Sequence, residues 1–131
     1  MNPQCQDIKT VLVGEGICTE PSVHLTRMPE SPDAVIAILD SAGSPPERLL
    51  EDYYKPMAQI LVRGTRNNYS ETKSTAESIF QFLYKCGSVI IGTTNYVGFI
   101  PTSDIIWLGY DQSDRPIFSM NFLMNRTIRR I

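Results

Sequence analysis

The stretch at residues 116–124 most constrains what this sequence can fold into. Large apolar side chains stand there at every second position: Phe118, Met120, Phe122 and Met124. Ser119 and Asn121 stand between them and point the other way. Because successive side chains of a strand project to opposite faces of its sheet, this alternation predicts a strand with one buried face. Another layer of structure must cover that face.

Two segments with helical spacing are available for this layer. Near the start of the chain, apolar side chains recur every three or four residues: Cys5, Ile8, Val11 and Leu12. A second stripe follows Tyr69 and includes Thr72, Ala76, Ile79, Phe80 and Leu83. Such spacing places the apolar side chains on one side of a helix. We therefore expect two amphipathic helices, which pack on one face of the sheet.

The remaining apolar stretches predict strands that are grouped rather than alternating with helices. They lie between residues 21 and 63, the first over residues 21–28, and again between residues 88 and 124. Asp111–Arg115 has the composition of a hairpin loop between the last two strands. Grouped strands with short connections favour an α+β fold with a mostly antiparallel sheet. The predicted order is α-β-β-β-α-β-β-β, in a single domain over residues 1–131.

One long segment, residues 40–55, interrupts this compact pattern and is predicted to be a loop. Its proline and large apolar residues are Pro45, Pro46, Leu49, Leu50, Tyr53 and Tyr54. Loops of this length in small domains are uncommon and are often functional. Two interpretations remain open. The apolar side chains fold back onto the core, or the segment is a docking arm that orders when a partner covers it.

Composition and charge exclude several classes of protein. The 131 residues include 12 Lys and Arg against 14 Asp and Glu, a formal net charge of −2, which excludes a strongly basic nucleic-acid module. No apolar stretch approaches the roughly 20 residues that span a bilayer, so we expect no membrane partner. The start of the chain lacks the pattern of a signal peptide. Cys5, Cys18 and Cys86 form no Cys-x-x-Cys pair, so no zinc knuckle or redox motif is expected.

No catalytic, metal or cofactor site emerges from the residues. His24 is the single histidine, and its place between Val23 and Leu25 in a strand favours a structural role. Without clustered ligands, neither a metal nor a cofactor is expected. Arg126, Arg129 and Arg130 make the C-terminus basic. They are either a solvated tail or a contact with another subunit or with DNA phosphates.

Several segments in order carry a resemblance to a known family. They are Leu25–Asp33, Ala37–Pro46, Met57–Gly64, the Tyr-led helix at Tyr69–Cys86, and Asn121-Phe122 on the last strand. Together they resemble the tail terminator, or minor capsid protein, family of long-tailed bacteriophages, from about Ile8 to Met124. Ala42 stands where the family more often has glycine, so the turn at this point is expected to differ.

The resemblance implies a structural virion protein and no enzyme. Such proteins form a ring, commonly hexameric, on the head-proximal end of the tail tube. The ring ends tube polymerisation and joins the tail to the head connector or stopper protein. The implied partners are further copies of the chain, the tail tube protein and this head protein, with double-stranded DNA passing through. The chain would be made in the host cytoplasm and reside in the virion tail.

Two other functions stay open at this stage. A head-completion or connector protein of the head–tail junction would have a similar size and composition, and it would bind the portal or connector rather than the tail tube. A small cytosolic hydrolase would have to use His24 with a serine or cysteine nucleophile. Exchanging His24 for alanine separates a hydrolase from a ring protein, because the ring protein should still assemble.

Overall fold

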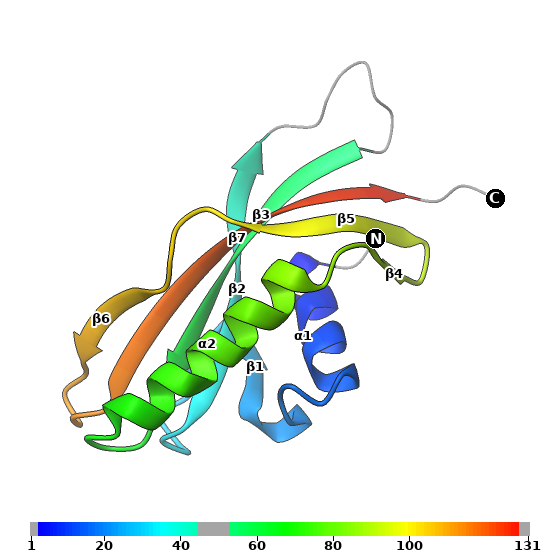
Figure 1. Ribbon diagram of the computed structural model, residues 1–131. Helices are drawn as coiled ribbons and strands as arrows, with labels where there is room; N and C mark the ends of the chain where they lie inside the picture. Colours follow the sequence, from blue (N-terminus) through cyan, green and yellow to red (C-terminus); the bar gives the residue numbers. More distant parts are fainter. Residues whose placement is uncertain (1–2, 45–52, 129–131) are drawn as a thin grey trace.

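The structure, a computed structural model, describes residues 3–44 and 53–128, and it shows an α+β fold (Figure 1). Its elements in chain order are α1 (Gln4–Gly14), the 3-10 helix η1 (Glu20–Ser22), β1 (Val23–Leu25), β2 (Val35–Ser44), β3 (Tyr53–Arg63), α2 (Tyr69–Lys85), β4 (Val89–Ile91), β5 (Thr94–Pro101), β6 (Ile106–Tyr110) and β7 (Pro116–Ile128). The predicted fold class and order are confirmed, and the short β4 adds a strand to the run after α2.

One sheet contains all seven described strands, and six of them follow the order β1-β2-β3-β7-β5-β4. The seventh strand, β6, pairs with the first residues of β7, whereas β5 pairs with the later residues of β7. Only β1 and β2 are parallel, and every other pair is antiparallel. β7, the last strand in sequence, therefore lies inside the sheet, where β3 flanks one side and β5 and β6 the other.

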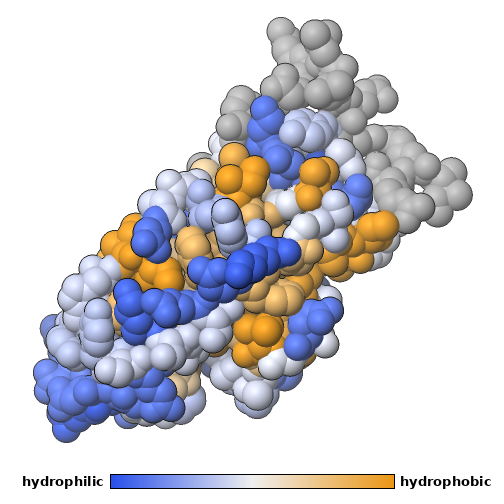
Figure 2. Space-filling model, in the orientation of Figure 1, coloured by the Kyte–Doolittle hydropathy of each residue, from blue (hydrophilic) through white to orange (hydrophobic). Residues whose placement is uncertain are grey.

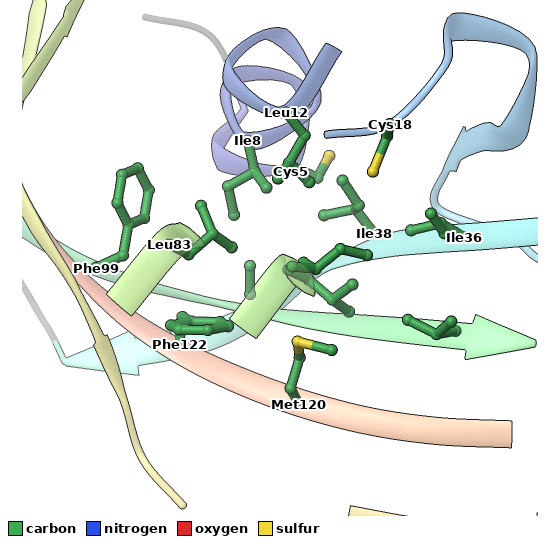
Figure 3. Close-up of a cluster of buried hydrophobic side chains, with 14 of the residues drawn as sticks. Cys5, Ile8, Leu12, Cys18, Ile36, Ile38, Leu83, Phe99, Met120 and Phe122 are labelled. Atoms are coloured by element: carbon green, nitrogen blue, oxygen red, sulfur yellow. The ribbon is translucent and has the colours of Figure 1, made fainter. Parts of the chain in front are cut away.

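The core lies between one face of this sheet and the two helices. β7 contributes the four alternating side chains predicted to be buried, and each is at most 1% exposed: Phe118, Met120, Phe122 and Met124. Ile8 and Leu12 of α1 and Leu83 of α2 converge on the same cluster (Figure 3). The one-sided packing of both helices, predicted from their apolar stripes, is confirmed. Burial of this apolar surface is the main force that holds the layers together.

The segment predicted as a loop over residues 40–55 is shorter in the structure at both ends. β2 continues to Ser44, with Ala42 inside the strand, and β3 begins at Tyr53. The hydrogen-bonded pairing of the two strands outweighs the turn-forming composition. Gly43 permits this approach, because a Cβ there would overlap the carbonyl oxygen of Lys55. The four residues Pro45, Pro46, Leu49 and Leu50 lie outside the described residues.

The first strand is also shorter than predicted, for reasons of backbone geometry. Pro21 lies in η1, and β1 comprises only Val23–Leu25. Thr26 then has a φ of 69°, a left-handed conformation that ends an extended strand. The connection to β2 contains a cis peptide bond between Ser31 and Pro32.

Candidate docking surface

An uncharged strand with exposed apolar side chains, β6, is the most unusual surface feature of the described chain. The exposed fractions are 40% for Ile106, 41% for Trp107, 54% for Leu108 and 51% for Tyr110. In Figure 2, apolar side chains reach the surface on the side of the molecule where β6 lies. Among the described residues β6 pairs with β7 alone, so one edge of its backbone has no strand beside it. Contiguous apolar surface and a free edge are both typical of association sites.

Aromatic contacts hold this strand in position. The ring of Trp107 lies 5.0 Å from that of Tyr69, the first residue of α2, and 5.0 Å from that of Phe118. Tyr110 contacts Trp107 edge-on, with 5.2 Å between the ring centres. Phe118 is 1% exposed and belongs to the core. The side chains of β6 therefore pack against the core through Trp107, which favours a preformed surface over a mobile one.

Acidic residues border β6 at both ends. Asp104 precedes the strand, and its carboxylate accepts a hydrogen bond from the backbone N–H of Ile105. Asp111 follows the strand and accepts from the backbone N–H groups of Arg115 and Ser113 at 2.9 Å. The hydrogen bond from the Arg115 backbone, together with that from its side chain, lowers the pKa of the Asp111 carboxyl. The apolar strand thus has an acidic residue at each of its borders.

Two buried arginines, Arg63 and Arg115, bind the turn at residues 29–33, next to the hairpin that β6 and β7 form. We call this group the arginine clamp. Arg63, at the end of β3, donates to the backbone carbonyls of Pro29, Pro32 and Asp33 at 2.6, 2.9 and 2.9 Å. Burial, followed by the neighbouring charge of Arg115, lowers the pKa of Arg63. The clamp joins three sequence-distant segments: the turn, the end of β3 and the β6–β7 hairpin.

Arg115 supplies the second half of this clamp through its side chain. It forms ion pairs with Glu30 at 2.9 Å, Asp33 at 3.3 Å and Asp111 at 2.8 Å. Burial opposes the positive charge of Arg115, but the hydrogen bond and charge of Asp111 and the charge of Glu30 raise its pKa overall. A planar guanidinium with several donors suits such a site better than an ammonium group does.

Arg126 lies inside the protein rather than on its surface. It is 7% exposed, and it donates to the hydroxyl of Tyr96 at 3.1 Å. Tyr96 in turn donates to the carboxylate of Asp7 at 2.5 Å, and burial followed by this hydrogen bond raises its pKa. The predicted contact of Arg126 with a subunit or with DNA is therefore not available to its side chain in the single chain. β7 continues past the residue at which the sequence predicts its end, and this places Arg126 in the core.

The remaining candidate residues do not assemble into a reactive group. His24 lies in β1 as predicted, and its buried Nε2 atom has no hydrogen-bond partner among the described residues. No three metal-binding side chains come together in residues 3–44 and 53–128. Within the same residues, no helix is both long and apolar enough to cross a membrane. A pocket of about 300 Å³ beside α2 is lined by none of the predicted site residues.

The comparison with known families agrees with this arrangement. The family model described as bacteriophage tail terminator protein matches residues 11–128, nearly the whole chain. The chain belongs to the bacteriophage tail terminator family. It is thus a structural protein of the phage tail, as the resemblance in sequence implies. A search of curated proteins finds no match.

Two of the segments that carry the family resemblance meet in this tail terminator at the arginine clamp. Arg63, from the stretch Met57–Gly64, binds the turn that ends the stretch Leu25–Asp33. Gly64 is required beside it, because a Cβ there would overlap Oγ1 of Thr72 in α2. This part of the motif therefore has a structural explanation in packing and hydrogen bonding.

The predicted docking residues that the structure describes lie in β3. Tyr53 and Tyr54 pair with Thr127 and Arg126 of β7, and the Tyr53 hydroxyl donates to the side chain of Asn125 at 3.1 Å. Both tyrosines are half-buried. Pro45, Pro46, Leu49, Leu50, Arg129 and Arg130 lie outside the described residues.

Sequence reasoning identified β6 as part of a strand but missed its exposed surface. The sequence pattern indicates the opposite: Ile106–Tyr110 has no charge, no proline and no alternation of apolar with polar residues. Such a pattern is typical of a strand buried on both faces. Only the tertiary structure, in which β6 lies at an edge of the sheet and its side chains are left uncovered, shows this exposed surface.

Proposed function

We propose that this tail terminator forms a hexameric ring at the head-proximal end of the tail tube. There it ends tail polymerisation and joins the tail to the head connector or stopper protein. The family match over residues 11–128 is the observation that carries this proposal. The proposed partners are further copies of the chain, the tail tube protein and the head connector protein.

The exposed surface of β6 supports the proposal that this protein functions within an assembly and not as a single subunit. Side chains as large as Trp107 and Leu108 are 41% and 54% exposed on an edge strand. An isolated protein gains nothing by exposing such a strand, and natural proteins usually protect sheet edges with charge or cover. A partner that covers β6 removes this apolar surface from water.

We further propose that residues 45–54 act as the arm that contacts the tail tube. The paired ends of β2 and β3 extend beyond the helices and lead to this segment (Figure 1). Tyr53 and Tyr54 anchor the second side of the arm through their pairing with β7. Extended segments that order on a partner are a common way to cover large surfaces.

Passage of DNA through the ring is compatible with the charge of the chain. The formal net charge is −2, so a ring of such subunits carries no net positive charge that would hold DNA by its phosphates. Arg129 and Arg130 remain proposed contacts with a neighbouring subunit or with DNA.

Electron microscopy of a phage that carries an early stop codon in this gene tests the function. Overlong tails beside separate DNA-filled heads are expected, because tube growth is no longer stopped. Tails of normal length beside separate or leaking heads would instead place the chain on the head side of the junction. Intact infectious particles would contradict a role in the virion altogether.

Complementation of the same phage tests the arm. A chain that lacks residues 45–52 keeps both tyrosines of β3 and the described core, so it is expected to fold but not to restore tail attachment. The wild-type chain is the positive control. Restored attachment by the shortened chain, with normal circular dichroism, would show that the arm is dispensable.

A further inference from the structure

The two free edges of one half of the sheet point to how copies join, an inference that rests on the proposed ring. β1 is one edge and β6 the other, with β2, β3 and β7 between them. A single row of paired residues crosses this half from edge to edge: Val23, Ile36, Val62, Phe118 and Trp107. We propose that β6 of one copy pairs with β1 of the next, so that the sheet continues from copy to copy.

Strand direction determines the form of this pairing. β1, β2 and β7 run one way, whereas β3 and β6 run the other way, as the parallel and antiparallel pairs require. When two copies lie side by side in the same orientation, β6 of the first is therefore antiparallel to β1 of the second. Such a contact uses different surfaces on the two copies, which is the type that closes into a ring.

Both edge strands are short, with three residues in β1 and five in β6, and apolar side chains lie at each of them. The pairing of β6 with β7 is regular over Ile106 and Trp107 before a bulge at Leu108. A shallow depression of about 520 Å³ lies beside β1, and Leu25 and Pro29 are among its lining residues. It offers space for the exposed side chains of a strand laid along β1. Backbone hydrogen bonds along the new edge would add to this apolar contact.

Charge at the ends of the strands favours the same arrangement. Arg27 lies two residues after β1 and also lines the depression, whereas Asp104 lies two residues before β6. Antiparallel pairing places these exposed residues next to each other, and neither forms an ion pair within the described residues of its own chain. Parallel pairing would separate them. Opposite charges at the border of an apolar contact select the partner and its orientation.

His24 gives an independent reason for a partner at this edge. Its buried Nε2 has no hydrogen-bond partner among the described residues, and a buried polar atom without one is costly. His24 is the central residue of β1 and also lines the depression beside this edge, so a partner seated there can supply polar groups to its side chain. In the single chain, the edge at β1 therefore leaves the His24 side chain without a partner for Nε2, and the edge at β6 has no neighbouring strand among the described residues.

Photo-crosslinking in assembled tails tests this pairing directly. The full chain with benzoylphenylalanine in place of Leu108 is supplied to the phage that carries the stop codon, and tails are irradiated and analysed by mass spectrometry. The expected product joins two copies, with the link in residues 23–29 of the second. The same replacement at Ile90, which is also 54% exposed but lies on β4, is the matched control and is expected to give no link to β1.

A charge exchange tests the orientation of the two strands. Arg27→Asp or Asp104→Arg alone is expected to reduce the two-copy product, because like charges then face each other. The double variant is expected to restore it, because each contact again joins opposite charges. A link from position 108 to another protein, to another element or to nothing would overturn the pairing. So would a double variant no better than the single ones.

Tail length, measured in the same preparations, separates this inference from the proposed function. Normal tail length with no link to β1 would overturn the pairing and leave the terminator function intact. A link to residues 23–29, in a phage whose tails reach normal length without the chain, would support the pairing and refute the terminator function.

Discussion

Arg63 shows how one buried side chain can organise a turn distant in sequence. Its guanidinium donates to four backbone carbonyls of residues 29–33 that would otherwise lack these partners. A lysine keeps the charge but has no planar fork to reach several carbonyls at once. The turn therefore depends on an arginine at this position.

Arg63→Lys is expected to destabilise the fold by about 1.5–3 kcal/mol, the usual range for lost hydrogen bonds to a charged group. The midpoint of urea unfolding measures the change. Arg66→Lys is the control, because the Arg66 side chain is 66% exposed and should change stability by less than about 0.5 kcal/mol. Equal effects of the two substitutions would argue against the clamp.

Asp111 makes the stability of the hairpin depend on pH. Its pKa is lowered in the folded chain, chiefly by the hydrogen bond from the Arg115 backbone. The ionised carboxylate therefore stabilises the fold above its unfolded pKa of about 3.9, and this contribution is lost as pH falls through the lower folded pKa. Asp111→Asn is expected to flatten the fall of the melting temperature below about pH 4. An unchanged pH profile would exclude this role for Asp111.

At the scale of elements, the contact between the end of β3 and the first turns of α2 decides how the helix sits on the sheet. A Cβ at Gly64 would overlap Oγ1 of Thr72, which is 4% exposed and itself donates to the backbone carbonyl of Asn68 at 2.6 Å. The glycine thus provides room for the helix and does not serve flexibility.

Gly64→Ala is expected to cost about 1–3 kcal/mol, the usual cost of overpacking a core. Gly14→Ala is the matched control, because a Cβ there meets nothing within 4 Å at the end of α1. It is expected to be neutral or to stabilise by up to about 1 kcal/mol through helix propensity. Thermal unfolding of both variants measures the difference, and a stable Gly64→Ala protein would show that α2 shifts without penalty.

At the scale of the whole molecule, one continuous core joins both helices to the sheet. Trp107, the single tryptophan, contacts Phe118 of this core from the exposed strand β6. Its fluorescence reports on β6, whereas far-ultraviolet circular dichroism reports on all the helices and strands.

The two signals are expected to change together on heating, as for a single domain that unfolds in one step. This result would support the prediction of one domain over residues 1–131. An earlier fluorescence transition would show that β6 detaches before the core unfolds. A variant with Trp107→Phe and Tyr84→Trp moves the probe to α2 and is expected to give the same midpoint.

The sequence alone determined the local features of this protein. The stripe in α2 and the alternation in β7 predicted the buried side chains, because each pattern depends only on the backbone period of its own element. The grouping of the strands predicted the α+β class. The order of short motifs predicted the family, which the family match confirms.

The tertiary structure decided which residues are exposed and which segments meet. β7 is last in sequence but lies inside the sheet, β6 is uncharged but lies at its edge, and Arg126 is near the C-terminus but buried. Arg63, Arg115 and residues 29–33 come together from three separate parts of the chain. Exposure and pairing depend on residues distant in sequence, and local periodicity carries no information about them.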